Sequence, residues 1–180
     1  LLIGNRDEFY ARPAEPLHHW PDAPILAGRD VQAGGTWLGV GPGGRVAALT
    51  NFRSAVPTNT QARSRGQLVT DFLQSPLDAT SYLRSLQAQA NAYNPFNLLV
   101  FDGHTLLGLE SRGARIVTLP PGLGAVSNAD FNTPWPKLRQ LRQGLAACVA
   151  RGETEDEHLC PLLQSRTLTK EEDLPHTGVA

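Results

Sequence analysis

Methionine is absent from all 180 residues, and only two of the sixteen basic residues are lysines, Lys137 and Lys170. The formal net charge is −1, so the chain lacks the excess of positive charge that marks proteins binding nucleic acid or an anionic membrane. No apolar run approaches the length of a membrane span. The two cysteines are too few for a disulfide framework and fit a reducing compartment, which predicts a cytoplasmic location.

What the chain does contain is typical of one globular domain. Hydrophobic residues make up 41% and charged residues 18% of it, and its length allows a sizeable core. It opens inside an apolar run, Leu1-Leu2-Ile3, that is typical of a buried strand, and it stops just after a turn-like stretch at 174–178. We therefore expect residues 1–180 to form a single domain within a longer protein, so a signal peptide is neither predicted nor excluded.

The spacing of apolar residues predicts strands, two helices, further strands and two final helices. Residues 13–24 are rich in proline and are expected to form an irregular loop. Glycines at 41–44 predict a hairpin turn, and short links elsewhere favour antiparallel pairing. This order indicates an α+β fold of antiparallel sheets with segregated helices. The predicted strands are 1–3, 36–40, 45–50, 96–101, 106–109 and 116–119, and the predicted helices are 64–75, 78–92, 134–152 and a last one from about 153.

Polar side chains follow three of the predicted strands or small-residue segments. Asn5, Arg6, Asp7 and Glu8 follow the first, Asn51 ends the hairpin, and Asn128 follows residues 122–127. Such groups could line one pocket rim, where asparagine amides can donate to a developing oxyanion. Two simpler interpretations stay open: the charged residues could be an ion pair at a strand end, and the asparagines could be turn residues.

The histidines and cysteines give weaker signals. His18 and His19 are adjacent, but no third ligand stands at a recognisable spacing, so no metal site is predicted. Cys148 and Cys160 fall on the predicted apolar faces of the last two helices. Both are therefore expected to be small core residues and not nucleophiles.

Six segments together resemble a known family. The chain is similar to the NRDE family, also called the transport and Golgi organisation protein 2 family, in GNRDEFYARP, AGGTWLGV, ALTNFRS, SRGQLVTDFL, SNADFNTPWPK and LPHTGV. The resemblance implies the N-terminal nucleophile hydrolase superfamily and a four-layer αββα sandwich of two antiparallel sheets covered by helices. In cysteine members of that superfamily, the nucleophile is the cysteine exposed when the initiator methionine is removed, and its own amine serves as the base.

The resemblance also implies roles for individual residues. Arg6 and Asp7 resemble the pair beside the nucleophile in amide-cleaving relatives, Asn51 resembles the oxyanion asparagine, and Asn128 resembles a second asparagine on the substrate side. The remaining rim and neighbouring side chains are assigned to substrate binding: Asn5, Glu8, Trp37 and Phe52. The expected partner is a small-molecule substrate or ligand, with no cofactor, metal or nucleic acid.

Two functions follow from this resemblance. The first is a cysteine-type hydrolase of a linear amide C–N bond, whose nucleophile would precede Leu1 and whose late arginine would lie beyond Ala180. The alternative is a non-enzymatic binding or trafficking protein for haem or lipid on the same fold, because a fold does not dictate a function.

The hydrolase interpretation makes a prediction about the gene. If Leu1 to Asn5 is the returning strand of a hairpin, the first strand starts beside Arg6 and Asp7. Sequencing upstream should then reveal Met-Cys on the order of 10–20 residues before Leu1. Any other residue after that methionine would remove the hydrolase interpretation.

Overall fold

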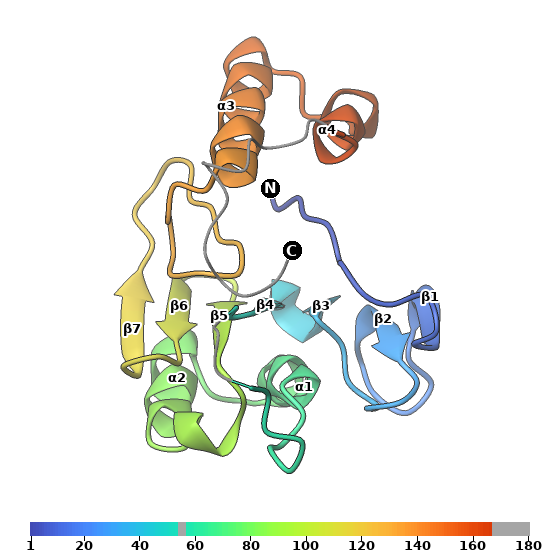
Figure 1. Cartoon of the computed structure of the whole chain (residues 1–180), viewed down its shortest axis with the longest axis vertical. Coiled ribbons are helices and arrows are strands. Elements are labelled where there is room, and N and C mark those ends of the chain that lie inside the picture. The colour runs from blue at the N-terminus through green and yellow to red at the C-terminus, as the bar shows by residue number, and fades with distance from the viewer. Residues whose placement is uncertain (54–56, 167–180) are drawn as a thin grey trace.

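The structure is a computed structural model that describes residues 1–53 and 57–166. Within these ranges the chain forms one antiparallel sheet of seven strands and four α-helices (Figure 1). The strands are β1 (Ala14–His19), β2 (Leu26–Asp30), β3 (Leu38–Val40), β4 (Val46–Asn51), β5 (Phe96–Phe101), β6 (Leu106–Glu110) and β7 (Arg115–Thr118). The helices are α1 (Gly66–Gln74), α2 (Ala79–Gln87), α3 (Pro136–Arg151) and α4 (Asp156–Leu163).

Every strand pairs with its neighbours in sequence, in the order β1-β2-β3-β4-β5-β6-β7. The predicted turn at 41–44 joins β3 to β4, and Gly43 and Gly44 have the positive φ that such a tight turn requires. Helices α1 and α2 are inserted between β4 and β5, yet these two strands pair along six residues. The α+β class and the antiparallel pairing predicted from the sequence are therefore confirmed. The described residues contain a single sheet, whereas a four-layer sandwich has two.

The core lies between one face of this sheet and the helices α1 and α2. Both helices bury the apolar residues that the sequence pattern predicted. Helices α3 and α4 pack on each other at the other end of the molecule (Figure 1), where Leu162 lies against Gly144. The buried residues of the main core include Leu68, Val69, Phe72 and Leu73 of α1, Tyr82, Leu83 and Leu86 of α2, and Ala47, Leu49, Phe96, Leu98, Val100, Leu107 and Leu109 of the sheet.

The prediction of an irregular loop over 13–24 was wrong. Residues Ala14–His19 form β1 at the edge of the sheet, and the register shifts between Glu15 and His18. Pro16 stands inside this irregularity. A proline cannot donate to a strand ladder, but an edge strand with a bulge accommodates it. Prolines that argued for a loop therefore mark an edge strand.

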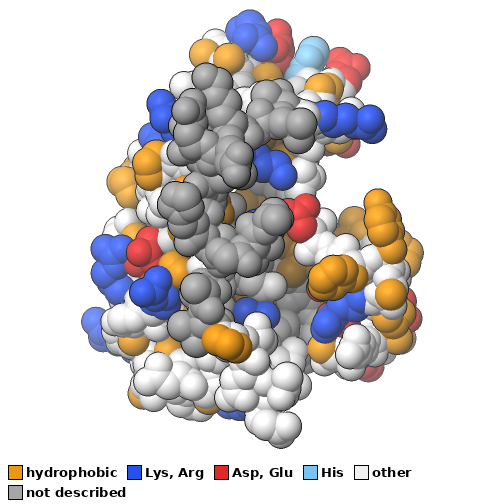
Figure 2. Space-filling model, viewed as in Figure 1, with side chains coloured by type: hydrophobic (Ala, Val, Ile, Leu, Met, Phe, Trp, Pro, Cys, Tyr) orange, Lys and Arg blue, Asp and Glu red, His pale blue; other side chains and the backbone are white. Residues whose placement is uncertain are grey.

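The prediction of a buried strand over Leu1–Ile3 was also wrong. Residues 1–9 have no regular secondary structure, and the side chain of Leu1 is 76% exposed. A strand is stable only when a neighbour takes up its backbone groups, and no described strand lies beside this segment. Figure 2 shows hydrophobic side chains on the side of the molecule where Figure 1 places this segment and β1, and Phe9, Tyr10 and Leu17 are among the most exposed.

The helices differ from their predictions mainly at the ends. Helix α2 has Asp78 as its predicted N-cap but stops at Gln87, and a short 3₁₀ turn at Ala90–Ala92 takes the place of its predicted last turns.

Cys148 is buried as predicted, whereas Cys160 is exposed, so its predicted place on an apolar face was wrong. The predicted turn at 174–178 lies outside the described residues. None of the described helices combines the length and apolar character needed to cross a membrane.

Asp102 ties the turn between β5 and β6 to the start of α2. One carboxylate oxygen accepts a hydrogen bond from the Ala79 backbone N–H at 2.9 Å, and the other accepts from the backbone N–H groups of His104 and Thr105 at 3.0 and 2.8 Å. These bonds, of which the one from Ala79 has the largest effect, lower the pKa of Asp102 to about 2, although burial acts in the opposite direction. The carboxylate therefore stabilises the fold only while it is ionised.

This contact predicts an acid-sensitive part of the stability. Because the folded pKa lies below the unfolded value of about 4, the contribution is present above pH 4 and is lost as the pH falls towards 2. Asp102→Asn should lower the free energy of unfolding by about 1 kcal/mol at neutral pH and flatten this part of the pH profile, measured by urea unfolding. Asp7→Asn, at an exposed side chain, is the control; an unchanged profile for Asp102→Asn would contradict the assignment.

Candidate functional site

Two of the predicted site residues, Asn51 and Asn128, lie in direct contact although they are 77 positions apart. The Asn128 side-chain amide donates to the Asn51 backbone carbonyl at 2.7 Å, and the Arg53 backbone N–H donates to the Asn128 carbonyl at 2.8 Å. Asn51 ends β4, where it pairs with Phe96 of β5. The Asn51 backbone is therefore held from both sides, while its exposed side chain makes no hydrogen bond with any described residue.

A row of polar side chains across three strands holds the segment that carries Asn128. Thr50, Asn97 and Glu110 face one another in register across β4, β5 and β6. The Thr50 hydroxyl donates to the Ser127 carbonyl at 2.6 Å, and the Asn97 amide donates to the Ala129 carbonyl at 2.7 Å. Glu110 accepts from the Phe131 backbone N–H at 2.8 Å. The loop 127–131 is thus attached to the sheet by one bond from each strand.

Sequence reasoning missed the two most deeply buried members of this row. Asn97 is 1% exposed and Glu110 is 2% exposed, and Arg115 of β7 pairs with Glu110. The signal was present, because each is a polar residue within or at the end of an otherwise apolar strand, FNLLVF and LLGLE. A polar group in that position is costly unless it is bonded, so it indicates an attachment to another segment.

Charged residues near the N-terminus form a second group. The Arg6 and Arg12 guanidinium groups lie 3.7 and 3.8 Å from the Glu8 carboxylate, and Arg12 also pairs with Asp30 at 2.7 Å. Burial raises the pKa of Asp30, but the hydrogen bonds from Arg12 and from the Ala33 backbone outweigh it and hold the pKa below its usual range. The charged residues of this segment thus form ion pairs, as the simpler interpretation held, but they follow no strand, and Arg12 and Asp30 are members that the sequence did not indicate.

Arg65 links the charged group to the end of β4. Its guanidinium donates to the Pro95 carbonyl at 3.1 Å, and the same carbonyl accepts the Phe52 backbone N–H at 3.0 Å. Burial lowers the pKa of Arg65, the nearby Arg12 lowers it further, and Glu8 raises it. Arg65 therefore interacts electrostatically with Arg12 and Glu8 of the charged group. It also shares the Pro95 carbonyl as an acceptor with Phe52, the residue that follows Asn51.

The other predicted site residues lie around these two groups without converging on one point. Asn5 donates to the Leu163 carbonyl at the end of α4 at 2.8 Å, and Asp7 is exposed. Trp37 lies beside Gly4, since a Cβ added there would be 3.9 Å from its ring. The ring of Phe52 lies under the guanidinium of Arg112, 4.8 Å from its centroid.

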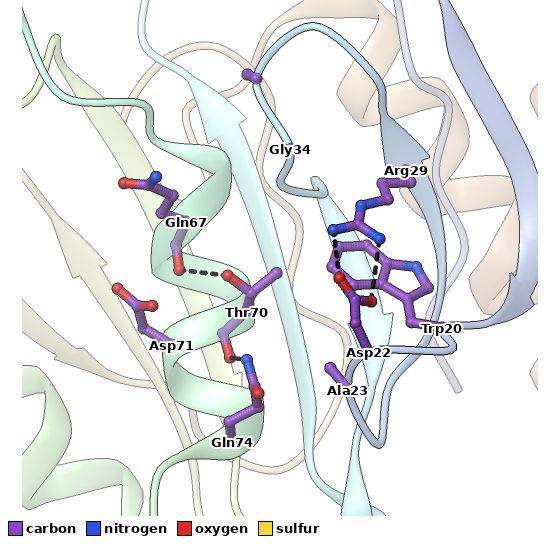
Figure 3. Close-up of a pocket in the computed structure, with 10 residues that line it drawn as sticks. Trp20, Asp22, Ala23, Arg29, Gly34, Gln67, Thr70, Asp71 and Gln74 are labelled. Atoms are coloured by element: carbon purple, nitrogen blue, oxygen red, sulfur yellow. Dashed lines mark hydrogen bonds and ion pairs between the residues drawn. The ribbon is translucent and has the colours of Figure 1, made fainter.

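A cavity among the described residues lies elsewhere. It has a volume of about 360 Å³ and opens between β2 and α1 (Figure 3). Arg29 lies over the Trp20 ring at 4.2 Å and donates two hydrogen bonds to Asp22, while Thr70 and Gln74 of α1 stand opposite. None of the predicted site residues lines it. The described part of the chain also contains no group of three or more histidine, cysteine, aspartate or glutamate side chains that could hold a metal ion.

The structure is therefore an α+β fold in which Asn51 and Asn128 meet at the end of β4. Arg65 links this end of the strand to the charged residues near the N-terminus. Comparison with known proteins gives the family. A family model described as Transport and Golgi organisation 2 matches residues 1–179, and the chain belongs to this family.

Curated relatives agree with this membership. The chain is similar to the Transport and Golgi organization protein 2 homolog of Bos taurus, with 41% identity over 84% of this chain and 58% of the relative. The Homo sapiens homolog is 39% identical over 85% of this chain and 59% of its own length. The Drosophila melanogaster Transport and Golgi organization protein 2 is 29% identical over 97% of this chain and 68% of its own length. The chain thus spans about three-fifths of the length of the two mammalian relatives.

The polar row predicts how Asn97 substitutions act. Asn97→Ala leaves the partly buried Ala129 carbonyl without its donor and should lower the free energy of unfolding by about 1–3 kcal/mol. Asn97→Asp should cost more, because it replaces the donor with a charge opposite Glu110. Hydrogen exchange of residues 125–132 should rise in both variants, and Asn91→Ala, at an exposed position, is the control. Unchanged exchange in this segment would contradict the attachment.

Proposed function

We propose that this chain is part of a cysteine-type N-terminal nucleophile hydrolase that cleaves a linear amide C–N bond, with its nucleophile outside residues 1–180. The observation that carries the proposal is that Asn51 combines a fixed backbone with a side-chain amide left unbonded by the described residues. Its backbone is fixed by β5 and by Asn128, and its side-chain amide is exposed and makes no described hydrogen bond. An amide donor that projects from a fixed backbone and has no described partner of its own could serve an oxyanion once the substrate arrives.

The roles follow from these contacts and from the resemblance. Attack of a cysteine sulfur on the amide carbon would place a negative charge on the carbonyl oxygen, to which the Asn51 amide would donate. Arg6 and Asp7 would orient the nucleophile, and Asn5, Glu8, Trp37 and Phe52 would contact the substrate. The bond from Asn128 to the Asn51 carbonyl supports a positioning role for Asn128 beside the substrate-side role implied by the resemblance.

The four-layer sandwich is part of the same proposal. The face of the sheet that points away from α1 and α2 carries a row of small or apolar residues in register: Leu38, Ala48, Leu99 and Gly108. In the next row, Val40 and Leu106 are 41% and 38% exposed. A second sheet, from the part of the protein that the mammalian relatives have in addition, would bury the part of this face that the loop 127–131 leaves uncovered. Residues 1–180 would then belong to one domain that is completed by further chain. The cytoplasmic location stays a prediction.

A second candidate is a non-enzymatic protein that binds or carries haem or lipid. The exposed apolar side chains Phe9, Tyr10 and Leu17 favour it, because a surface of this kind suits an amphipathic ligand. A full-length protein that binds such a ligand but releases no product from a range of linear amides would support this candidate over the hydrolase.

The Asn51 assignment is tested in the complete protein. Because the contact strengthens only as charge develops, Asn51→Ala should lower kcat about 100- to 1000-fold with little change in KM. Asn51→Asp should be at least as harmful, because it places a negative acceptor against the growing charge. A folded Asn51→Ala protein with unshifted melting temperature and full amide-cleaving activity would exclude the oxyanion role.

The role of Asn128 is tested by the double variant. If Asn128 acts by holding Asn51, its loss should lower kcat, and Asn51→Ala/Asn128→Ala should be no slower than Asn51→Ala alone. If it contacts substrate independently, its loss should raise KM and the two effects should multiply. Asn91→Ala serves again as the control variant.

A further inference from the structure

Arg65 is a half-buried cation whose described contacts leave most of its hydrogen-bonding capacity unused. A guanidinium has five N–H donors, and the one described acceptor for Arg65 is the Pro95 carbonyl. Among residues 1–53 and 57–166, no carboxylate forms an ion pair with it, whereas the half-buried Arg12 and Arg29 each have one. The half-buried Arg53 likewise has no ion pair with a described carboxylate. Glu8 acts on Arg65 electrostatically without forming an ion pair with it. A partly buried charge without a directly bound counter-charge is costly, so this arrangement favours the binding of a further anion.

The backbone around Arg65 is fixed by close packing. Arg65 immediately precedes α1, and the next residue, Gly66, lies against Gly35, where an added Cβ would come within 2.5 Å of the Gly66 carbonyl carbon. The Thr36 backbone N–H also donates to the Gly66 carbonyl at 3.4 Å. The bond to Pro95 then holds the guanidinium itself. A ligand would therefore meet a cation that is already oriented, and little ordering would oppose its binding.

The nearby carboxylates are already engaged by other arginines. Glu8 lies within 4 Å of Arg6 and Arg12, and Asp30 accepts a short hydrogen bond from Arg12. Burial lowers the pKa of Arg65, Arg12 lowers it further as a like charge, and Glu8 opposes both effects. A guanidinium remains protonated even so, and its repulsion by Arg12 would be relieved by an anion placed between them or beside Arg65.

We propose that Arg65 binds an oxyanionic group of the ligand, a carboxylate or a phosphate, beside the Asn51 end of β4. The inference rests on the proposed function in one respect, since it places this group in the same site. The planar fork of the guanidinium can take two oxygens of such a group at once, which a neutral ligand cannot offer. The anionic group would then fix which bond of the ligand lies at Asn51.

The test uses the full-length protein and three probes that share one linear amide: N-benzoylglycine, its neutral primary amide, and N-benzoylaminomethylphosphonate. Calorimetry should show that at least one anionic probe binds about ten- to a hundredfold more tightly than the neutral one, with a preference that falls as salt is added. The carboxylate and phosphonate arms tell which oxyanion is preferred. Equal binding of all three probes would overturn the inference.

Variants assign the preference to this residue. Arg65→Gln should reduce it to less than about threefold, and Arg65→Lys, which keeps the charge but not the fork, should retain an intermediate preference. Arg139→Gln, which removes a guanidinium at an exposed position of α3, should leave it unchanged. A folded Arg65→Gln protein that keeps the full preference would overturn the assignment. If Arg65→Gln does not fold, the Arg65→Lys variant is the test. An unchanged preference of that variant for the anionic probes would overturn the assignment to Arg65.

Release of benzoate, measured separately, keeps the two proposals apart. Turnover without any preference for the anionic probes would retain the hydrolase and remove the role of Arg65. A preference that depends on Arg65 without turnover would retain the anion site and favour the binding protein over the hydrolase.

Discussion

The interaction on which the rest of the site depends is the attachment of the loop 127–131 to the sheet. Thr50, Asn97 and Glu110 each satisfy a backbone group of that loop, and two of these side chains are almost completely buried. Buried polar groups cost free energy if they lose their partners, so loop and sheet cannot separate without a penalty on both sides. Phe131 adds packing to these bonds, because its ring covers Gly108 so closely that a Cβ there would lie 2.6 Å from it. The position of Asn128 is therefore set by the sheet.

A second attachment reaches the same place from the other direction. The Pro95 carbonyl accepts from Phe52 and from Arg65, and the close contact of Gly35 with Gly66 fixes the start of the helix that follows Arg65. The end of β4 thus lies between a loop held by hydrogen bonds and a helix start held by packing. The Asn51 backbone is therefore held on both sides, while its side chain is exposed and makes no hydrogen bond with a described residue.

The sequence predicted those parts in which local pattern and tertiary burial agree. The spacing of Leu68, Phe72 and Leu83 indicated helices because the same residues face the core, and FNLLVF indicated β5 because the strand is otherwise apolar around its one asparagine. The prediction failed at Leu1–Ile3, where an apolar run alone could not supply a pairing partner, and at Pro16, where a bulge absorbs a residue that usually ends a strand. Asn128 contacts the backbone carbonyl of Asn51, while the shared pocket rim stays a prediction. The residues that hold this region, Asn97 and Arg65, depend on contacts between distant segments that no local pattern carries.

The bulge in β1 has a consequence for behaviour at high concentration. An open sheet ends in strands whose outward N–H and C=O groups can pair with another molecule, and an apolar edge makes such pairing favourable. Here the edge strand carries Leu17 on its surface, with Phe9 and Tyr10 nearby, which would be a hazard on a flat strand. Pro16 offers no N–H, and the shifted register between Glu15 and His18 interrupts the template at the same point. The described sheet can therefore expose apolar side chains along this edge without offering a continuous strand with which the edge of another molecule could pair.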